Sequence, residues 1–522
     1  MKAEEGEGMQ FDPAGFSQPR PANFSGFVHA RNAQLVDGAG NAVLLRGVGL
    51  GNWLLPEGYM WKFGPGAESP REIEKLVVNL LGEGSAEDFW NDFREIFISE
   101  ADIELISRSG FDHVRLPINS RFIMTDEGEP IEAGFLLIDR LIEWCRKHQL
   151  WVLLDLHGAP GGQTGTNIDD SPNGKPELFM DSRYWDQTLE IWRVLATRYA
   201  HETVVLGYDL LNEPIPNEWQ YQYADELARL YRELTAVIRA VDKKHLIVYE
   251  GSHWATNWDI FTEVWDENSL LQFHKYWSAP DTASIQKFLD VRDRLGLPIY
   301  MGEGGENNIE WIYTAFRLYE THDIGWNFWP WKKIETITSP LSVIAPPGWD
   351  EIQNFAHLGT TLPRGRAQSI FSELLNNFKV ENCLMRSEIV SALLAQNPKV
   401  IPAWGFDFRG EEESYSTQSA KSMTGMRQED SVTLEYRFAA ERKDHNFEQS
   451  DGREYTELEE IVVHLNQGEW LEYVVSPSTE LSKCIVETDE SEIANVTLTP
   501  SVRGFRLTAN GSVLLSRIRF LF

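Results

Sequence analysis

The chain has 522 residues, which is too long for one ordinary domain, so its length predicts two or three domains. Hydrophobic residues make up 42% and charged residues 24%, the balance of a globular protein rather than a disordered one. A formal net charge of −33 disfavours nucleic acid and anionic membrane surfaces, and we expect neither as a partner. The three cysteines, Cys145, Cys383 and Cys484, lack the spacing of a disulfide framework or a zinc cluster.

The first 25 residues, rich in Gly, Pro and Glu, predict a poorly ordered N-terminal lead-in. The opening letters MKAEEGEGMQ contain no basic region followed by an apolar stretch, so we do not expect a signal peptide there. No apolar run reaches the length of a membrane span. A β-hairpin with Asp37 and Gly38 at its turn is expected next.

Short apolar runs then alternate with amphipathic stretches. The expected strands are 43–50, 111–117, 150–157, 204–214, 245–251, 270–277, 297–305 and 324–331. The expected helices between them are 86–108, 135–148, 183–200, 219–241, 282–295 and 306–321. Eight apolar strands separated by helices are typical of a covered parallel sheet, and their number predicts an α/β fold, a closed (β/α)₈ TIM barrel over residues 26–403.

A doubly wound open sheet is the structural alternative. Its usual glycine fingerprint is missing, because Asn52 follows Gly47, Gly49 and Gly51 where the third glycine of the motif would stand. The sequence therefore favours the barrel.

The pattern of apolar and polar residues changes near Trp404. A long loop over 339–363 and helical patterns over 366–396 precede short alternating strands with turn residues. Residues 404–522 therefore predict a C-terminal antiparallel β-sandwich, which we interpret as an accessory domain, and whether it binds carbohydrate stays open at this point.

Polar side chains gather where the expected strands end. In a closed barrel the carboxyl ends of the strands share one rim, and active sites form there. The residues at these ends are Arg115, His157, Asn212, Glu213, His274, Tyr276, Glu303 and Trp329.

Glu213 and Glu303 end the fourth and seventh strands, so we expect them to face each other across the barrel mouth. Hydrolysis of a glycosidic bond needs one neutral carboxylic acid and one ionised carboxylate, in surroundings that separate their proton affinities. Arg115 and Tyr276 are expected to stabilise the ionised form of Glu303. Asn212 offers an amide to a sugar 2-hydroxyl.

Six motifs carry a family resemblance. The stretches HVRLPI, LDLHGAPGGQ, LLNEP, HKYW, PIYMGEGG and GWNFWPWKK resemble glycoside hydrolase family five, of the clan of retaining (β/α)₈ glycosidases, over roughly residues 30–380. GVGLGNWLLPEGYM and HGAPGGQTG are most similar to its exo-β-1,3-glucanase and β-glucosidase-like branch. TNIDDSPNG departs from that branch and leaves the substrate open.

The resemblance implies a retaining hydrolase of β-glucans or β-glucosides with no cofactor and no metal. Glu213 would be its acid/base and Glu303 its nucleophile. The residues that would hold the sugar are Arg115, His157, Asn212, His274, Tyr276, Trp329 and Glu57. Because substrates of this class are usually extracellular, we expect a secreted or periplasmic location rather than a cytoplasmic one.

Several alternatives stay open at this point. Within the class, another β-linked sugar such as a mannoside, a galactoside or a xylan fragment is possible. Outside the class of retaining glycosidases, two further alternatives are a non-catalytic carbohydrate-binding protein on the same fold and a metal-dependent hydrolase. Linkage preference, exo or endo action, transglycosylation and oligomeric state depend on features outside these motifs, above all the loops at 56–84, 158–183 and 332–363.

Overall fold

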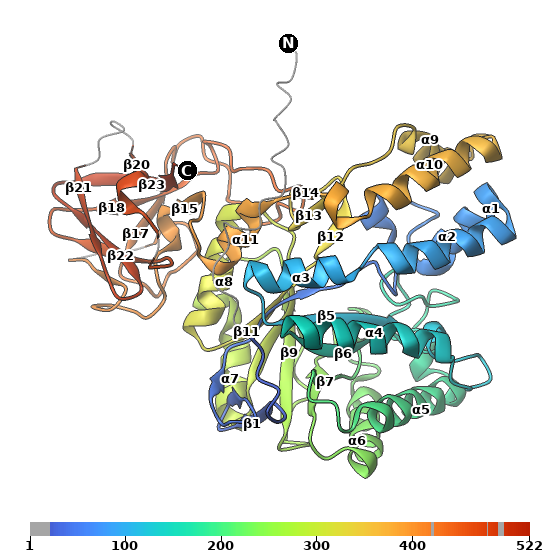
Figure 1. Ribbon diagram of the computed structural model, residues 1–522. Helices are drawn as coiled ribbons and strands as arrows, with labels where there is room; N and C mark the ends of the chain where they lie inside the picture. Colours follow the sequence, from blue (N-terminus) through green and yellow to red (C-terminus); the bar gives the residue numbers. More distant parts are fainter. Residues whose placement is uncertain (1–20, 419–421, 478, 489–494, 522) are drawn as a thin grey trace. The chain divides into compact units, whose positions relative to one another are not determined.

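The computed structural model describes residues 21–418, 422–477, 479–488 and 495–521 (Figure 1). The chain divides into two compact units. The first comprises residues up to His274 together with 291–304 and 326–385, and the second comprises 275–290, 305–325 and the chain from Arg386 on. The predicted accessory domain, 404–522, falls in the second unit.

Eight parallel strands close into a barrel, which confirms the predicted fold. The strands are β4 (Arg46–Gly49), β5 (His113–Asn119), β6 (Trp151–Gly158), β7 (Val205–Asp209), β8 (Leu246–Glu250), β9 (Ser269–Lys275), β10 (Ile299–Gly305) and β11 (Gly325–Trp329). Their order around the barrel follows the chain, with β11 pairing in parallel with β4. All eight begin within three residues of the predicted runs and end within five, because each run is mostly apolar and buried on both faces.

Helices lie between successive barrel strands of the described chain except between β8 and β9, and further helices follow β11 (Figure 1). They are α1 (Pro70–Leu81), α2 (Glu83–Ile96), α3 (Glu100–Ser109), α4 (Glu132–His148), α5 (Ser182–Tyr199), α6 (Ala224–Val241), α7 (Gln286–Leu295), α8 (Ile309–Thr321), α9 (Trp349–Leu358), α10 (Arg364–Asn377) and α11 (Ser387–Leu394). The amphipathic stretches predicted as helices are confirmed, and 86–108 contains two helices, α2 and α3.

Two segments expected as loops contain regular structure. The segment 56–84 holds α1, whose start is fixed by a capping box between Ser69 and Glu72 with Pro70 at the first helical position. The segment 339–363 holds α9 and the strand β13 (Leu341–Val343), which pairs with β12 (Lys332–Ile334) and β14 (Leu384–Met385). The prolines at 346 and 347 suggested a loop, but they precede α9 instead of interrupting it.

The N-terminal part of the described chain forms a small antiparallel sheet. It consists of β1 (His29–Arg31), β2 (Gln34–Val36) and β3 (Ala42–Val43), with the predicted hairpin turn between β2 and β3. The Asp37 carboxylate accepts the backbone N–H groups of Ala39 and Asn41, both at 2.9 Å, which fixes the turn. Residues 1–20 of the predicted lead-in lie outside the described residues, while Ala22 is buried and donates to the Gln149 carbonyl.

The second unit contains two antiparallel sheets in a sandwich-like arrangement, as predicted. One holds β15 (Val400–Pro402), β17 (Thr433–Tyr436), β18 (Ile461–Leu465), β20 (Cys484–Thr488) and β23 (Val513–Phe520). The other holds β16 (Tyr415–Ser416), β19 (Trp470–Val474), β21 (Val496–Pro500) and β22 (Gly504–Ala509). Along β22 half-buried and buried residues alternate, the pattern of a strand with one face toward a core.

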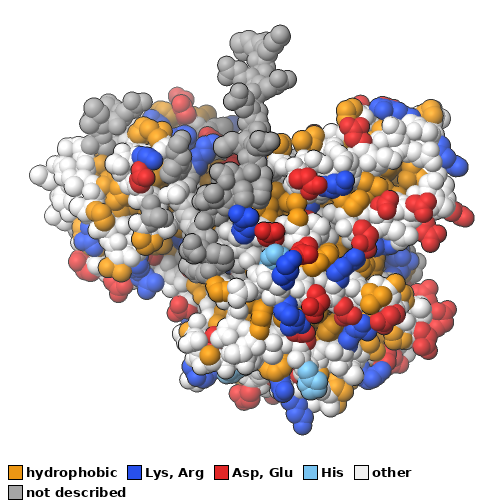
Figure 2. Space-filling view, in the orientation of Figure 1, with side chains coloured by type: hydrophobic (Ala, Val, Ile, Leu, Met, Phe, Trp, Pro, Cys, Tyr) orange, Lys and Arg blue, Asp and Glu red, His pale blue; other side chains and the backbone are white. Residues whose placement is uncertain are grey.

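Acidic and basic side chains are interspersed over the face shown in Figure 2. The negative balance of the sequence is therefore not gathered into one acidic area on this face. No helix of the described chain combines the length and the apolar composition that crossing a membrane requires.

An aromatic cluster around Trp61 joins the barrel to the α9–α10 segment within the first unit. Trp61 is fully buried. Its ring centroid lies 5.2 Å from that of Phe93, 5.6 Å from that of Phe378 and 6.4 Å from that of Trp349. Its indole nitrogen donates to Asn52 Oδ1 at 2.6 Å. Packing of this kind is sensitive to truncation because the neighbours cannot collapse into the cavity.

We expect Trp61→Ala to lower the free energy of unfolding of the barrel by about 3–5 kcal/mol. Tyr221→Ala is the matched control, because the Tyr221 side chain is 76% exposed and its removal should change stability by less than about 0.5 kcal/mol. Urea denaturation followed by tryptophan fluorescence measures both. Equal losses in the two variants would contradict a packed cluster at Trp61.

Candidate active site

The carboxyl ends of the barrel strands bring the predicted polar residues to one rim. These residues lie on different strands, yet parallel strands in a closed barrel all end on the same side. Arg115 lies in β5, His157 in β6, His274 in β9 and Glu303 in β10, Asn212 and Glu213 follow β7, and Trp329 ends β11. The contacts described below connect all seven.

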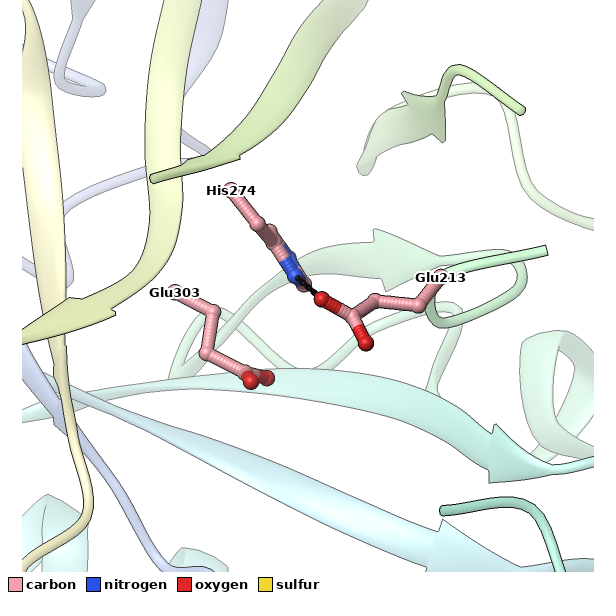
Figure 3. Close-up of side chains that lie close together, drawn as sticks. All are labelled: Glu213, His274 and Glu303. Atoms are coloured by element: carbon pink, nitrogen blue, oxygen red, sulfur yellow. Dashed lines mark hydrogen bonds and ion pairs between the residues drawn. The ribbon is translucent and has the colours of Figure 1, made fainter. Parts of the chain in front are cut away.

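Glu213 and Glu303 approach each other with His274 beside them (Figure 3). One oxygen of each carboxylate and one His274 nitrogen all lie within 4.8 Å of one another. His274 Nδ1 and Glu213 Oε1 are hydrogen-bonded at 2.7 Å. The Glu213 side chain is 13% exposed and that of Glu303 is 7% exposed, so both reach the edge of the buried site.

Arg115 is the buried cation of the site. Its guanidinium is fully buried and donates from Nη1 to Glu303 Oε2 at 2.8 Å and from Nε to Asp209 Oδ2 at 2.9 Å. Nη2 donates to Asn212 Oδ1 at 2.8 Å and to Glu250 Oε1 at 3.1 Å. Burial alone would lower the pKa of Arg115, but the surrounding carboxylates raise it well above its usual range, so it stays charged.

Two aspartates beneath the rim have a strong preference for the neutral form. Burial raises the pKa of Asp155 and of Asp209 well above the usual value, and neighbouring carboxylates add to the effect against the opposing field of Arg115. One oxygen of each carboxyl, Oδ1, makes no hydrogen bond within the described chain. An ionised oxygen left without a donor is far more costly than a neutral one, which agrees with this direction.

Glu250 and His274, unlike these aspartates, favour their charged forms. Burial by itself would raise the pKa of Glu250, but His274, Arg115 and the backbone N–H of Glu213 lower it. Burial would likewise lower the pKa of His274, but Glu250, Glu303 and the hydrogen bond to Glu213 raise it well above the usual value. The pair therefore favours a carboxylate and an imidazolium.

His157 is the neutral histidine of the site. Burial lowers its pKa to about 4, against the fields of Glu303 and other carboxylates. Its Nδ1 lies 2.7 Å from Asp155 Oδ2, and its Nε2 lies 3.3 Å from Asn212 Nδ2. The neutral ring meets both contacts if Nδ1 donates to Asp155 and Nε2 accepts from the Asn212 amide.

The three glutamates of the site differ in the cation that each contacts. The site holds two cations, Arg115 and His274, and two aspartyl groups that favour the neutral form. Glu250 and Glu303 each contact Arg115, whereas Glu213 contacts His274. The two catalytic candidates therefore have different electrostatic surroundings, as an acid and a nucleophile require.

The spacing of Glu213, His274 and Glu303 also suits a metal ion, although the sequence predicted no metal site. Metal binding requires a neutral imidazole nitrogen. His274 favours the imidazolium form, whose nitrogens both carry hydrogens, and it lies 3.3 Å from Glu250 Oε1 on its Nε2 side. The donor set therefore fits a hydrogen-bonded catalytic pair better than a metal centre.

Trp329 forms one wall of the site and is only 2% exposed. Its ring stacks on His157 with 5.4 Å between centroids and 8° between planes, and its indole nitrogen donates to Tyr59 Oη at 2.9 Å. The ring lies against Gly49 and Gly51 of the β4 region, where an added Cβ would come within 2.5 Å and 2.7 Å of it. Neither position accepts a side chain while the ring stays in place.

Two predicted site residues lie on the segments beside the strand ends. Glu57 is buried and precedes the short 3₁₀ helix Gly58–Trp61, and its backbone N–H donates to Asn52 Oδ1 at 3.3 Å. Tyr276 directly follows β9 in the second unit, and its ring centroid is 5.7 Å from that of Trp277. Their contacts with a sugar, and that of Tyr276 with Glu303, stay predictions.

The sequence analysis assigned no site role to Asp155, Asp209, Glu250 or Gln272. Gln272 Nε2 donates to Asp209 Oδ2 at 3.0 Å and to Glu250 Oε1 at 2.5 Å. The spacing of residues along the strands could have identified two of them. Asp155 stands two positions before His157, and Gln272 two before His274, so each pair shares the barrel interior face.

A polar cavity of about 230 Å³ opens beside the ends of β5 and β6. Its lining includes Asn119, Arg121, Asp170 and Tyr184. Asp170 is buried, accepts from Asn119 Nδ2 at 2.9 Å and from Arg121 Nε at 2.6 Å, and so holds the 158–183 loop against β5. The loop that we expect to influence specificity therefore borders a defined space.

A closed eight-stranded barrel with two glutamates and a buried arginine at one rim is the arrangement of the retaining β-glycosidases. A sequence model described as Cellulase (glycosyl hydrolase family 5) matches residues 79–334. The chain belongs to glycoside hydrolase family 5, and it is a hydrolase that acts on β-glycosides.

Three relatives show the range of activities named around this chain. It is 30% identical over 287 residues to a probable glucan 1,3-beta-glucosidase A of Emericella nidulans, covering 53% of this chain and 69% of the relative. It is 27% identical to a beta-xylosidase of Phanerodontia chrysosporium, covering 59% and 71%. It is also 27% identical to endoglucanase C of Acetivibrio thermocellus, covering 50% and 92%.

We expect His157 and His274 to show opposite protonation states in the same protein. Nitrogen-15 NMR of histidine-labelled protein, assigned with His157→Gln and His274→Gln, should find His157 neutral from pH 8 down to about 5, because burial lowers its pKa to about 4. His274 should remain an imidazolium over the same range, because its carboxylate neighbours raise its pKa. A neutral His274 at pH 6 would contradict the charge assignment of the cluster.

Proposed function

We propose that the protein cleaves β-glucosidic bonds in β-glucans or β-glucosides by double displacement, with Glu213 as acid/base and Glu303 as nucleophile. The approach of these two carboxyl groups, with an oxygen of each inside the 4.8 Å cluster, is the observation that carries the proposal. Retaining enzymes separate the two carboxyl groups by about 5–5.5 Å, whereas inverting enzymes leave about 6.5–9.5 Å for a water molecule.

The first step forms a bond between Glu303 and the anomeric carbon. The glycosidic C–O bond breaks, and Glu213 gives its proton to the leaving oxygen. Arg115, 2.8 Å from Glu303 Oε2, orients the nucleophile before the reaction. In the second step a water molecule gives a proton to Glu213 and attacks the anomeric carbon, which releases the sugar and restores the Glu303 carboxylate.

The sugar is held by the residues around the pair. Asn212 accepts from Arg115 through Oδ1 and faces His157 through Nδ2, which leaves one amide hydrogen for the sugar 2-hydroxyl. Trp329 offers an aromatic wall beside the anomeric centre. Glu57 and Tyr276 are proposed to complete the sugar site, by contact with the terminal sugar and by a hydrogen bond to Glu303.

Replacing either catalytic glutamate should give a distinct kinetic pattern. Glu303→Ala should lower kcat with an aryl β-glucoside by at least about 10⁴-fold, because no nucleophile remains. In Glu213→Ala, kcat/KM should fall by about 10²–10⁴-fold with an alkyl β-glucoside. It should fall much less with 2,4-dinitrophenyl β-glucoside, because that leaving group departs without a proton. Added azide should restore Glu213→Ala and yield β-glucosyl azide.

The stereochemistry of the product tests the mechanism independently. Proton NMR of the first sugar released by the wild type should show the β-anomer before mutarotation. A first product in the α-configuration would refute double displacement even if both glutamates proved essential.

The relatives support glucose as the sugar, since an endoglucanase and a probable glucan 1,3-beta-glucosidase are among them. Xylose is the second candidate, because the chain covers 71% of a relative named beta-xylosidase. Xylose lacks the exocyclic hydroxymethyl group of glucose. A pocket shaped for glucose contacts this group, and a xyloside cannot make those contacts.

We expect p-nitrophenyl β-glucoside to be cleaved with a kcat/KM at least about tenfold above that of the β-xyloside, β-mannoside and β-galactoside, since one lost set of contacts is worth about 1–3 kcal/mol. A panel of these four compounds with laminaribiose and cellobiose measures the preference. A higher kcat/KM for the β-xyloside would reassign the substrate and leave the mechanism unchanged.

A further inference from the structure

Glu250, at the end of β8, contacts the partners of both catalytic glutamates. It is fully buried. Its Oε2 accepts the backbone N–H of Glu213 at 2.7 Å. Its Oε1 accepts from Arg115 Nη2 at 3.1 Å and lies 3.3 Å from His274 Nε2. Arg115 in turn contacts the carboxylate of Glu303, and His274 contacts that of Glu213.

The backbone of Glu213 needs such a restraint. Its φ is +42°, in the left-handed region that a residue with a side chain rarely adopts. A conformation of this kind is strained and persists only where the surroundings impose it. A hydrogen bond from an N–H group to a buried carboxylate is among the stronger ones available to hold it.

We propose that Glu250 is a positioning residue that fixes the backbone of the acid/base and contacts its histidine partner, so that one buried carboxylate connects Glu213 to Glu303. This inference rests on the proposed double displacement. It adds a member to the site at the end of β8, a strand to which the sequence motifs assigned no role.

The reaction moves negative charge between the two sides of Glu250. When Glu303 forms its ester with the anomeric carbon, it loses its charge, and Glu213 gains one as its proton leaves with the alcohol. The charge therefore passes from the neighbour of Arg115 to the neighbour of His274. Glu250 keeps a constant charge that holds both cations in place through the two steps.

Several other charged or polar groups face Glu250 and His274. They come from every strand packed against them and are Arg115 on β5, Asp155 and His157 on β6, Asp209 on β7, Glu213 after β7, Gln272 on β9 and Glu303 on β10. Of these, Asp155, Asp209 and His157 favour neutral forms. Glu250 and Glu303 therefore supply most of the field that raises the pKa of His274.

Glu250→Gln tests the proposal, because it keeps the shape of the side chain and removes its charge. With an alkyl β-glucoside, kcat should fall by about 10²-fold, since protonation of the leaving group is impaired. With 2,4-dinitrophenyl β-glucoside the first step should fall by less than about tenfold, because that leaving group needs no proton. In nitrogen-15 NMR, His274 should lose its proton at a lower pH than in the wild type.

Asp242→Asn is the matched control. Asp242 is a buried carboxylate just before the other end of β8, where it contacts the buried His245 and Tyr208. Removing it should leave the ratio of the two substrates and the His274 titration unchanged. Glu250→Asp, which retains the charge, should keep His274 protonated and recover at least about tenfold of the activity that Glu250→Gln loses.

Three outcomes would overturn the proposal. They are equal losses with both substrates, a His274 titration that is the same in Glu250→Gln as in the wild type, and a His274 that is already neutral in the wild type at pH 7. The last is measured on unaltered protein, so it decides the matter even if Glu250→Gln does not fold. A wild type that cleaves no β-glycoside would instead refute the proposed function, and the NMR result would still stand by itself.

Discussion

The site depends on one guanidinium group with no exposure to water. Arg115 meets the carboxylates of Asp155, Asp209, Glu250 and Glu303, which come from four other strands of the barrel. A cation buried without such partners would be prohibitively expensive, and four carboxylates gathered without the cation would repel one another. The strand ends can therefore meet only if the arginine and its partners are all present, which ties the local geometry of the site to the closure of the barrel.

The same electrostatic arrangement gives similar groups different tasks. Two histidines, one on β6 and one on β9, favour opposite protonation states, because His157 lies beside the neutral-favouring Asp155 whereas His274 lies between Glu213 and Glu250. In the mechanism that we propose, three glutamates likewise divide into a proton donor, a nucleophile and a fixed charge. Their side chains are chemically identical, so the division comes from the donors that each carboxylate accepts.

The fold was predictable from the sequence because each barrel strand is a continuous apolar run and because polar residues mark its end. Glu213 and Glu303 were predictable for the same reason, since a barrel leaves only one rim for such residues. Trp329 and His157 were placed at that rim, but not their stacking on each other, which depends on two glycines of a different strand. Asp209 and Gln272 were missed because a single polar residue within an apolar strand does not indicate a site until its hydrogen-bond partners are known.

The helices that were not predicted show a different limit. α1 carries apolar residues at helical spacing, from Ile73 to Leu81, which the expectation of a loop overlooked, whereas the two prolines before α9 suggested an irregular loop. Capping at Ser69 and packing of Trp349 against Trp61 and Phe63 decide their structure, and only the second of these requires the folded barrel. Loops at the rim are thus harder to predict than the strands that carry the chemistry.

The glycines beneath Trp329 restrict how the protein can change. Because Gly49 and Gly51 have no room for even a methyl group, the aromatic wall cannot be reshaped from the strand below it. Laboratory evolution toward a different sugar would then accumulate its substitutions in the surrounding loops. Libraries that randomise Gly49 and Gly51 would return mostly inactive clones.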